Sequence, residues 1–174
     1  MALINKVLPG YVATIWCQTG ANPVALTDTQ LETWTAQVAD IIGVAAGGTG
    51  TDGILVPVEV VPPFGADDAV AAYSVAGART GAKITTQNQV TSLAVTAAWN
   101  PADTAQLLIR EDGYNGSIIR TYVVAVYDGT DTVAYAFNAR VGGMTWDMNT
   151  SAEGKFNFTL HPVGGNSYGW SNSP

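Results

Sequence analysis

The stretch that decides the fold is RTYVVAVYDGTDTVAYAFNARV, residues 120–141. Its Asp128-Gly129 pair lies between two runs rich in β-branched and aromatic residues, which is typical of a β-hairpin. In the first run apolar side chains point to both faces, because successive side chains alternate across a strand. A hairpin on the surface of a small domain is expected to have one polar face. The sequence therefore predicts that something covers the second face of this hairpin.

Composition favours a protein that assembles with itself. The 174 residues are 47% hydrophobic and 12% charged, whereas an average soluble domain carries roughly 25% charged residues. So few charges favour a subunit that buries surface against other copies. The alternative is a monomer with a neutral surface rich in Thr, Asn and Gly. The net charge of −7 argues against a protein that grips nucleic acid, because that affinity comes mainly from Lys and Arg.

We expect neither a membrane span nor an exported, disulfide-bonded protein. No apolar run reaches the roughly 20 residues that a span needs. The start of the chain, MALINKVLPGYVATIWC, lacks the small-residue cleavage site of a signal peptide. A single cysteine, Cys17, excludes an internal disulfide framework.

Periodicity predicts about seven strands and two helices. The expected strands are 11–17, 54–61, 70–76, 88–98, 117–127, 132–141 and 155–162. Pro57 places the second strand at an edge or a bulge, since proline cannot donate to a ladder.

The two predicted helices follow from apolar spacing and capping residues. Apolar residues recur at intervals of 3 and 4 from Leu31 to Ala45, so a helix is expected over about 30–46, with Thr29 and Glu32 as a capping box. Asn100-Pro101 opens a second helix over about 101–112, with Gly113 as its stop.

The expected fold class is mainly β: an antiparallel β-sandwich or barrel with one or two flanking α-helices. The helices do not alternate with strands as βαβ units require. We expect one domain over 1–174, with a helix-bearing insert at 18–53 and a C-terminal tail at 163–174. Pure disorder rarely keeps large aromatic residues, so the tail is expected to dock on something.

Residue types suited to catalysis or metal binding are scarce. One histidine, His161, and one distant cysteine make a zinc site improbable. The acidic pairs Asp67-Asp68 and Glu111-Asp112 lie beside turn signals and are expected to be solvated. Glu59 interrupts an apolar strand, so it is expected to face water, a channel or a basic partner. We expect no enzyme, no metal and no cofactor; a small hydrolase with a cryptic site is the remote alternative.

The second half of the chain has a distinctive order of elements. A strand ending near Trp99 is followed by Asn-Pro-x-Asp and a short helix, then by the hairpin with AFNARV at 136–141, a glycine-containing bend, and the alternating strand KFNFTLHP. This order, over about 70–164, resembles the major tail tube proteins of long-tailed bacteriophages.

The resemblance implies hexameric rings, in which the sheets of neighbouring subunits join into a β-barrel around a channel. Stacked rings would form a tube in a virion tail, assembled in the host cytoplasm, through which DNA passes without specific binding. A sheath, a tape measure protein and a terminator are the possible partners. The hairpin would bury its second face against a neighbour.

Three groups of candidate contact residues follow. Contacts between subunits are expected at Tyr122, Val124, Tyr135, Phe137, Arg79 and Lys83; contacts between rings at Trp34, Tyr168 and Trp170; and Glu59 is the candidate acidic residue of the channel wall. Two alternatives remain: a tube protein of a type VI secretion or other contractile injection device, and a monomeric β-sandwich module for capsid decoration or adhesion.

Overall fold

The computed structural model describes residues 12–20, 23–32, 36–42, 52–73, 82–127, 132–148, 153–163 and 169–172. Its strands are β1 (Val12–Gln18), β2 (Gly53–Val56), β3 (Ala66–Tyr73), β4 (Ala82–Val90), β5 (Leu93–Ala98), β6 (Arg120–Tyr127), β7 (Thr132–Asp147), β8 (Lys155–Pro162) and β9 (Gly169–Asn172). Its helices are α1 (Asp28–Glu32), α2 (Ala36–Ile42) and α3 (Thr104–Asn115).

The main sheet is antiparallel and has the strand order β2-β1-β6-β7-β8-β5, with β9 paired to β7. The predicted hairpin lies at its centre, where β6 and β7 pair from Arg120 opposite Ala139 to Tyr127 opposite Thr132. The mainly β fold class is thereby confirmed. Because β2 and β5 are edges of this order, the sheet is not closed into a barrel.

One face of the bent sheet encloses the larger core. The backbone NH of Glu59 donates to the Thr96 carbonyl at 3.1 Å, and that of Thr91 donates to the Gly65 carbonyl at 3.1 Å. The segment after β2 thus reaches β5 at the opposite edge, and α3 packs on the same core. The buried members of this larger core are Ile15, Cys17, Val56, Leu93, Val95, Ala105, Ile109, Tyr122, Val124, Tyr135, Phe137, Ala139, Val141, Phe156, Phe158 and Leu160.

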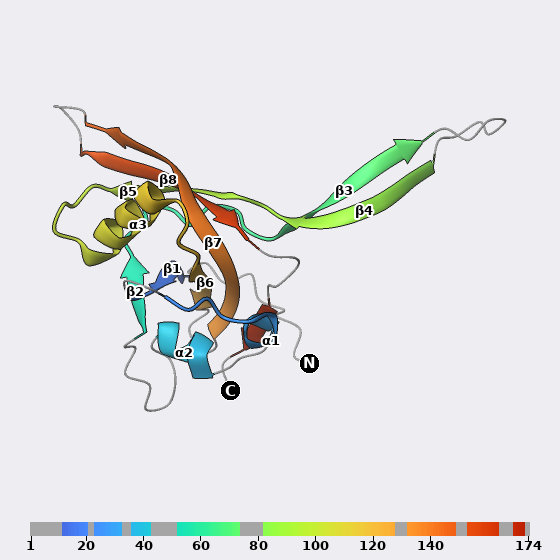
Figure 1. The fold of residues 1–174 in the computed structure, drawn as a ribbon, viewed down its shortest axis with the longest axis horizontal. Helices are drawn as coiled ribbons and strands as arrows, with labels where there is room; N and C mark the ends of the chain where they lie inside the picture. The colour runs from blue at the N-terminus through green and yellow to red at the C-terminus, as the bar shows by residue number, and fades with distance from the viewer. Residues whose placement is uncertain are drawn as a thin grey trace.

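A second, two-stranded sheet consists of β3 and β4 alone. Figure 1 shows this ribbon projecting away from the rest of the molecule. The expected strand over 88–98 is therefore two strands in different sheets, β4 and β5, which are separated at Thr91-Ser92. The second expected strand is shorter than predicted, since β2 ends at Val56, immediately before Pro57. Its predicted place at an edge is confirmed.

The first predicted helix appears as α1 and α2, and residues 33–35 and 43–46 lie outside the described residues. The predicted cap is wrong. The side-chain oxygen Oε1 of Gln30 accepts the backbone NH of Thr27 at 2.9 Å, so the cap lies two residues before the predicted Thr29 and the helix begins at Asp28. The buried stripe is confirmed at Leu31, Val38 and Ile41.

The second predicted helix also begins elsewhere. Asp103 caps α3 by accepting the Gln106 NH at 2.9 Å, whereas Asn100 closes the turn before it by accepting the Ala102 NH at 3.1 Å. The helix ends at Gly116, whose φ of 64° is left-handed. Gly113, the predicted stop, lies inside the helix, where Met144 of β7 occupies the space that a Cβ would need.

Candidate assembly surfaces

The second face of the central hairpin is covered by the chain's own helices. Val123 and Ala125 on β6, with Ala134 and Ala136 on β7, form a buried cluster with Leu26, Leu31, Val38, Ile41 and Ile42. The expectation that a neighbouring subunit covers this face is therefore wrong. The helix-bearing insert at 18–53 packs in its described parts on its own sheet (Figure 1).

Polar contacts fasten this insert to the hairpin. The buried Thr121 hydroxyl accepts the Leu26 NH at 3.1 Å and donates to Asn138 Oδ1 at 2.8 Å. The Asn138 amide donates in turn to the Leu26 carbonyl at 2.8 Å. Leu26 is thus held by both strands of the hairpin, two residues before α1 begins at Asp28.

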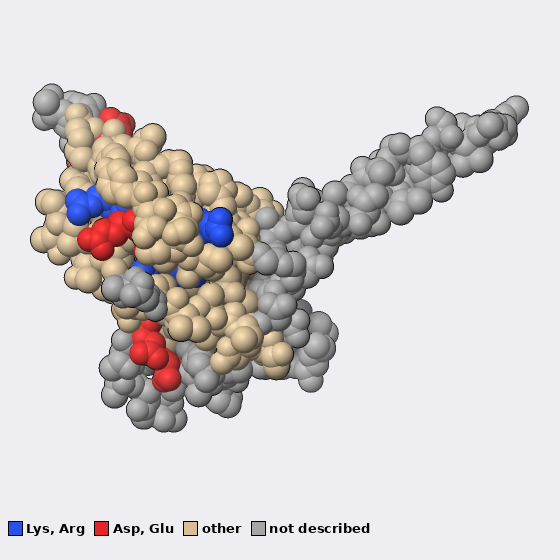
Figure 2. All heavy atoms as spheres, viewed as in Figure 1, with Lys and Arg blue, Asp and Glu red and all other residues tan. Residues whose placement is uncertain are grey.

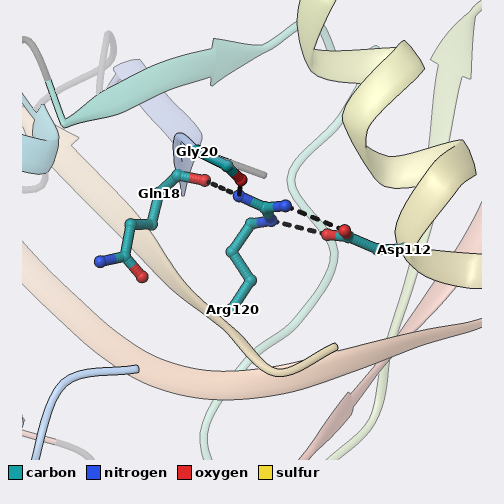
Figure 3. Close-up of polar contacts among 4 residues, drawn as sticks. All are labelled: Gln18, Gly20, Asp112 and Arg120. Atoms are coloured by element: carbon teal, nitrogen blue, oxygen red, sulfur yellow. Dashed lines mark hydrogen bonds and ion pairs between the residues drawn. The ribbon is translucent and has the colours of Figure 1, made fainter. Parts of the chain in front are cut away.

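A buried ion pair lies beside this attachment. Arg120 Nε and Nη2 donate to the two carboxylate oxygens of Asp112 at 2.6 and 2.9 Å, and Nη1 donates to the carbonyls of Gln18 and Gly20 at 2.6 and 2.9 Å. Figure 3 shows the guanidinium between the carboxylate and the two carbonyls. One side chain therefore joins β6, α3 and the chain that leaves β1.

The expectation that Asp112 is solvated is wrong, because its side chain is only 3% exposed. Burial by itself would lower the pKa of Arg120, but the hydrogen bonds and the charge of Asp112 outweigh it and raise that pKa. Sequence reasoning missed the pair. Its signal was Arg120 at the start of an apolar strand, the same kind of signal that singled out Glu59.

The expected contacts between subunits mostly lie in the core of this chain. Tyr122, Val124, Tyr135 and Phe137 are at most 1% exposed and pack against one another and against the α3 side of the sheet. We therefore assign these four side chains to the stability of the subunit. Arg79 lies outside the described residues, and Lys83 lies on β4 opposite Ala72.

The expected contacts between rings are only partly described. Trp34 and Tyr168 lie outside the described residues. Trp170 is on β9, opposite Tyr135 of β7. The expectation that the tail docks is thus confirmed for residues 169–172, and its site is β7 of the same chain.

Glu59 has the basic partner that was one of its three expected environments. Its Oε2 lies 3.1 Å from Lys155 Nζ, and both side chains are about one-third to two-fifths exposed (34% and 42%). An exposed pair of this kind contributes about 0–1 kcal/mol to stability. The contact links the segment after β2 to β8.

The remaining reactive groups suggest no catalytic centre within the described ranges. Cys17 is a buried core residue, and burial raises the pKa of its thiol to about 12. His161 is exposed, with Nδ1 3.2 Å from the Ser92 hydroxyl. Among the described residues, no group of three His, Cys, Asp or Glu side chains is placed to hold a metal. In the same part of the chain, no helix has the length and apolar character to cross a membrane.

Among the described residues, large apolar side chains that stay exposed occur on loops, on the edge strand β2 and in the last turn of α3. They are Val24, Leu55, Val60, Tyr114 and Met148. Leu55 lies on the edge strand β2, and Val60 lies in the segment that follows it. An edge strand with exposed apolar neighbours is a surface suited to contact with another chain.

Comparison with known proteins gives a match by structure alone. No protein-family profile matches the sequence, and no curated protein matches it. A chain from the cryo-EM structure of an extracellular contractile injection system, described as the PVC sheath/tube terminator in the extended state, is similar with a TM-score of 0.60 and 10% identity. The match covers 99% of this chain and 100% of that chain. The chain thus shares its fold, over nearly its whole length, with a component of a contractile injection system.

Proposed function

We propose that this chain is a structural subunit of a phage tail or related injection machine, and that copies of it form stacked hexameric rings around a channel. The observation that carries the proposal is the fold shared end to end with a chain of a sheath/tube terminator structure. The tail-tube resemblance of residues 70–164 supports the same assignment from the sequence. In this proposal 1–174 acts as one tail-tube-like domain without enzymatic activity or a cofactor.

The shape of the sheet supports assembly through its edges. Both β2 and β5 are edges of the main sheet. The Thr96 carbonyl of β5 already accepts the Glu59 NH, and the edge groups that have no such partner can pair with another strand. Pairing between the edges of neighbouring subunits would continue the sheet around a ring. In a phage tail such a ring would surround DNA that passes without specific binding, and the tube would meet a sheath, a tape measure protein and a terminator.

A second candidate is a terminator ring that ends a tube instead of building it. The fold shared with a chain of a sheath/tube terminator structure supports this candidate. A tube subunit adds rings without limit, whereas a terminator stops at one ring or a small stack. A tube protein of a secretion device would behave like the tube subunit in solution.

Negative-stain electron microscopy of the purified protein over a range of concentrations tests the proposal. Hollow tubes of uniform width are expected for a tube subunit, and discrete rings for a terminator. Light scattering on the same samples should show mass rising with concentration. Monodisperse monomers at the highest concentration would contradict self-assembly and favour a monomeric decoration or adhesion module.

A further inference from the structure

We propose that a basic spot binds an acidic spot in a second copy of this chain. The basic spot consists of Arg140, His161 and Ser92 on the outer face of the main sheet, which is the face opposite α3. The acidic spot consists of the carboxylates of Asp40 and Asp52. The inference rests on the proposed self-assembly and names one contact by which it occurs. The spot and its acidic counterpart lie on different elements of the fold.

The basic spot is a row across neighbouring strands. Arg140 on β7 lies opposite His161 on β8, and the Ser92 hydroxyl, just before β5, lies 3.2 Å from His161 Nδ1. A Cβ at Gly142 would lie 3.0 Å from His161 Cδ2 and Nε2, so the imidazole lies over the Gly142 backbone on the face that carries Arg140. Arg140, His161 and Ser92 are all exposed.

Arg140 is an exposed basic residue that forms no ion pair with the described part of its own chain. Within the described ranges Lys155 pairs with Glu59 and Arg120 pairs with Asp112, whereas Arg140 and the less exposed Arg110 of α3 have no ion pair. Figure 2 shows, near the end of β8, a basic patch with no acidic atoms beside it. In a chain of net charge −7, an exposed cation without an ion pair among the described residues is available to an acidic partner.

The acidic counterpart lies where α2 meets β2. Asp40 is on α2 and the exposed Asp52 directly precedes β2. The close approach of Gly53 to the Ile41 backbone brings these two elements together. Figure 2 shows an acidic patch over α2 and the start of β2. Neither carboxylate has an ion pair among the described residues.

Charge complementarity selects a second copy as the occupant. Acidic subunits repel one another unless their few cations meet carboxylates at the contact. Because the two spots are different patches of one surface, their contact is head-to-tail, and such contacts generate rings or open stacks. A single arginine with a histidine is a small footprint for nucleic acid, whose binding needs several phosphate contacts.

Charge reversal with a rescue tests the contact. Arg140→Glu alone, and Asp40→Lys with Asp52→Lys, should each raise the concentration for half-assembly about tenfold or more, because like charges then face each other. An equimolar mixture of the two proteins should assemble at close to the wild-type concentration, since each contact between unlike subunits again joins opposite charges. The matched control is Arg110→Glu, the same charge change on α3, which should assemble as wild type does. Light scattering measures the assembly, and circular dichroism confirms that each variant is folded.

The outcomes separate this contact from the proposed function. If wild type assembles and Arg140→Glu assembles equally well, or if the mixture fails to recover, the contact is wrong and the assembly stands. If Arg140→Glu assembles normally but binds less duplex DNA than wild type does, the basic spot is a nucleic-acid contact and the proposed contact between copies is again overturned. If wild type stays monomeric throughout, both the proposed function and this contact are contradicted.

Discussion

Arg120 on β6 and Asp112 near the end of α3 form a buried ion pair with two hydrogen bonds, of 2.6 and 2.9 Å. The pair ties the central hairpin to the helix that packs on its inner face. The same guanidinium holds the Gln18 and Gly20 carbonyls, so the orientation of the insert over the outer face also depends on it. A single buried cation thus organises both faces of the hairpin.

Removing the negative partner of this pair should strongly destabilise the fold. Asp112→Asn leaves a buried guanidinium without its counter-charge, and breaking a buried pair in this way costs about 3–5 kcal/mol. Urea unfolding followed by circular dichroism measures the loss of unfolding free energy. The matched control is Glu111→Gln, an exposed carboxylate one residue away, which should stay within about 0.5 kcal/mol of wild type. Equal stability of the two variants would mean that the pair contributes little.

The helices that cover the hairpin should contribute to stability as core elements do. Leu31 is 1% exposed and packs on the hairpin's second face, so Leu31→Ala should cost about 2–5 kcal/mol. Val24 lies in the same insert but is 82% exposed, and Val24→Ala serves as the control with little effect. Thermal unfolding of both variants, at a concentration below assembly, makes the comparison. If Leu31→Ala were as stable as wild type but assembled poorly, the helices would act between subunits instead.

The sequence predicted the local elements of this fold better than the contacts between them. The hairpin over 120–141 was predicted because its turn residues and apolar runs are adjacent in the chain. The cover of its second face was not, because Leu31 and Ile41 lie far from Val123 in sequence and meet it only through the tertiary fold. A resemblance in element order therefore suggested a neighbouring subunit where the chain itself supplies the cover.

Two further differences between the sequence predictions and the structure have physical reasons: two residues can give the same local signal, and a tertiary contact leaves no periodic signal. Asn100 and Asp103 are both good capping residues, and only the structure shows that Asn100 closes a turn while Asp103 accepts the first free NH of α3. The Arg120–Asp112 pair joins a strand to a helix, so no helical or strand spacing reveals it. The basic spot around Arg140 likewise depends on strand order, which periodicity does not give.

A close backbone approach makes Gly53 sensitive to substitution. A Cβ at this position would overlap the Ile41 backbone, and a helix backbone cannot rotate away as a side chain can. Gly53→Ala should therefore cost about 1–3 kcal/mol, as overpacking does, by separating α2 from β2. Asp52→Ala, an exposed change at the preceding residue, is the control for unfolding below the assembly concentration. An unchanged unfolding midpoint for Gly53→Ala would show that α2 and β2 are not packed this closely.

Burial should make Cys17 unreactive and its stabilising effect dependent on pH. The pKa of its thiol is raised from 9.0 to about 12, chiefly by burial, so the native protein should not react with a thiol reagent at pH 8. Ser117→Cys adds an exposed thiol on the segment after α3, and this variant should react with one equivalent before unfolding and two after.

Because the pKa of the Cys17 thiol is higher in the folded state than in the unfolded state, the stability from the neutral thiol is complete below about pH 9 and is lost as the pH rises toward 12. Wild type should therefore lose unfolding free energy more steeply over this window than Cys17→Ala. Parallel slopes for the two proteins would show that the thiol is not held neutral by burial.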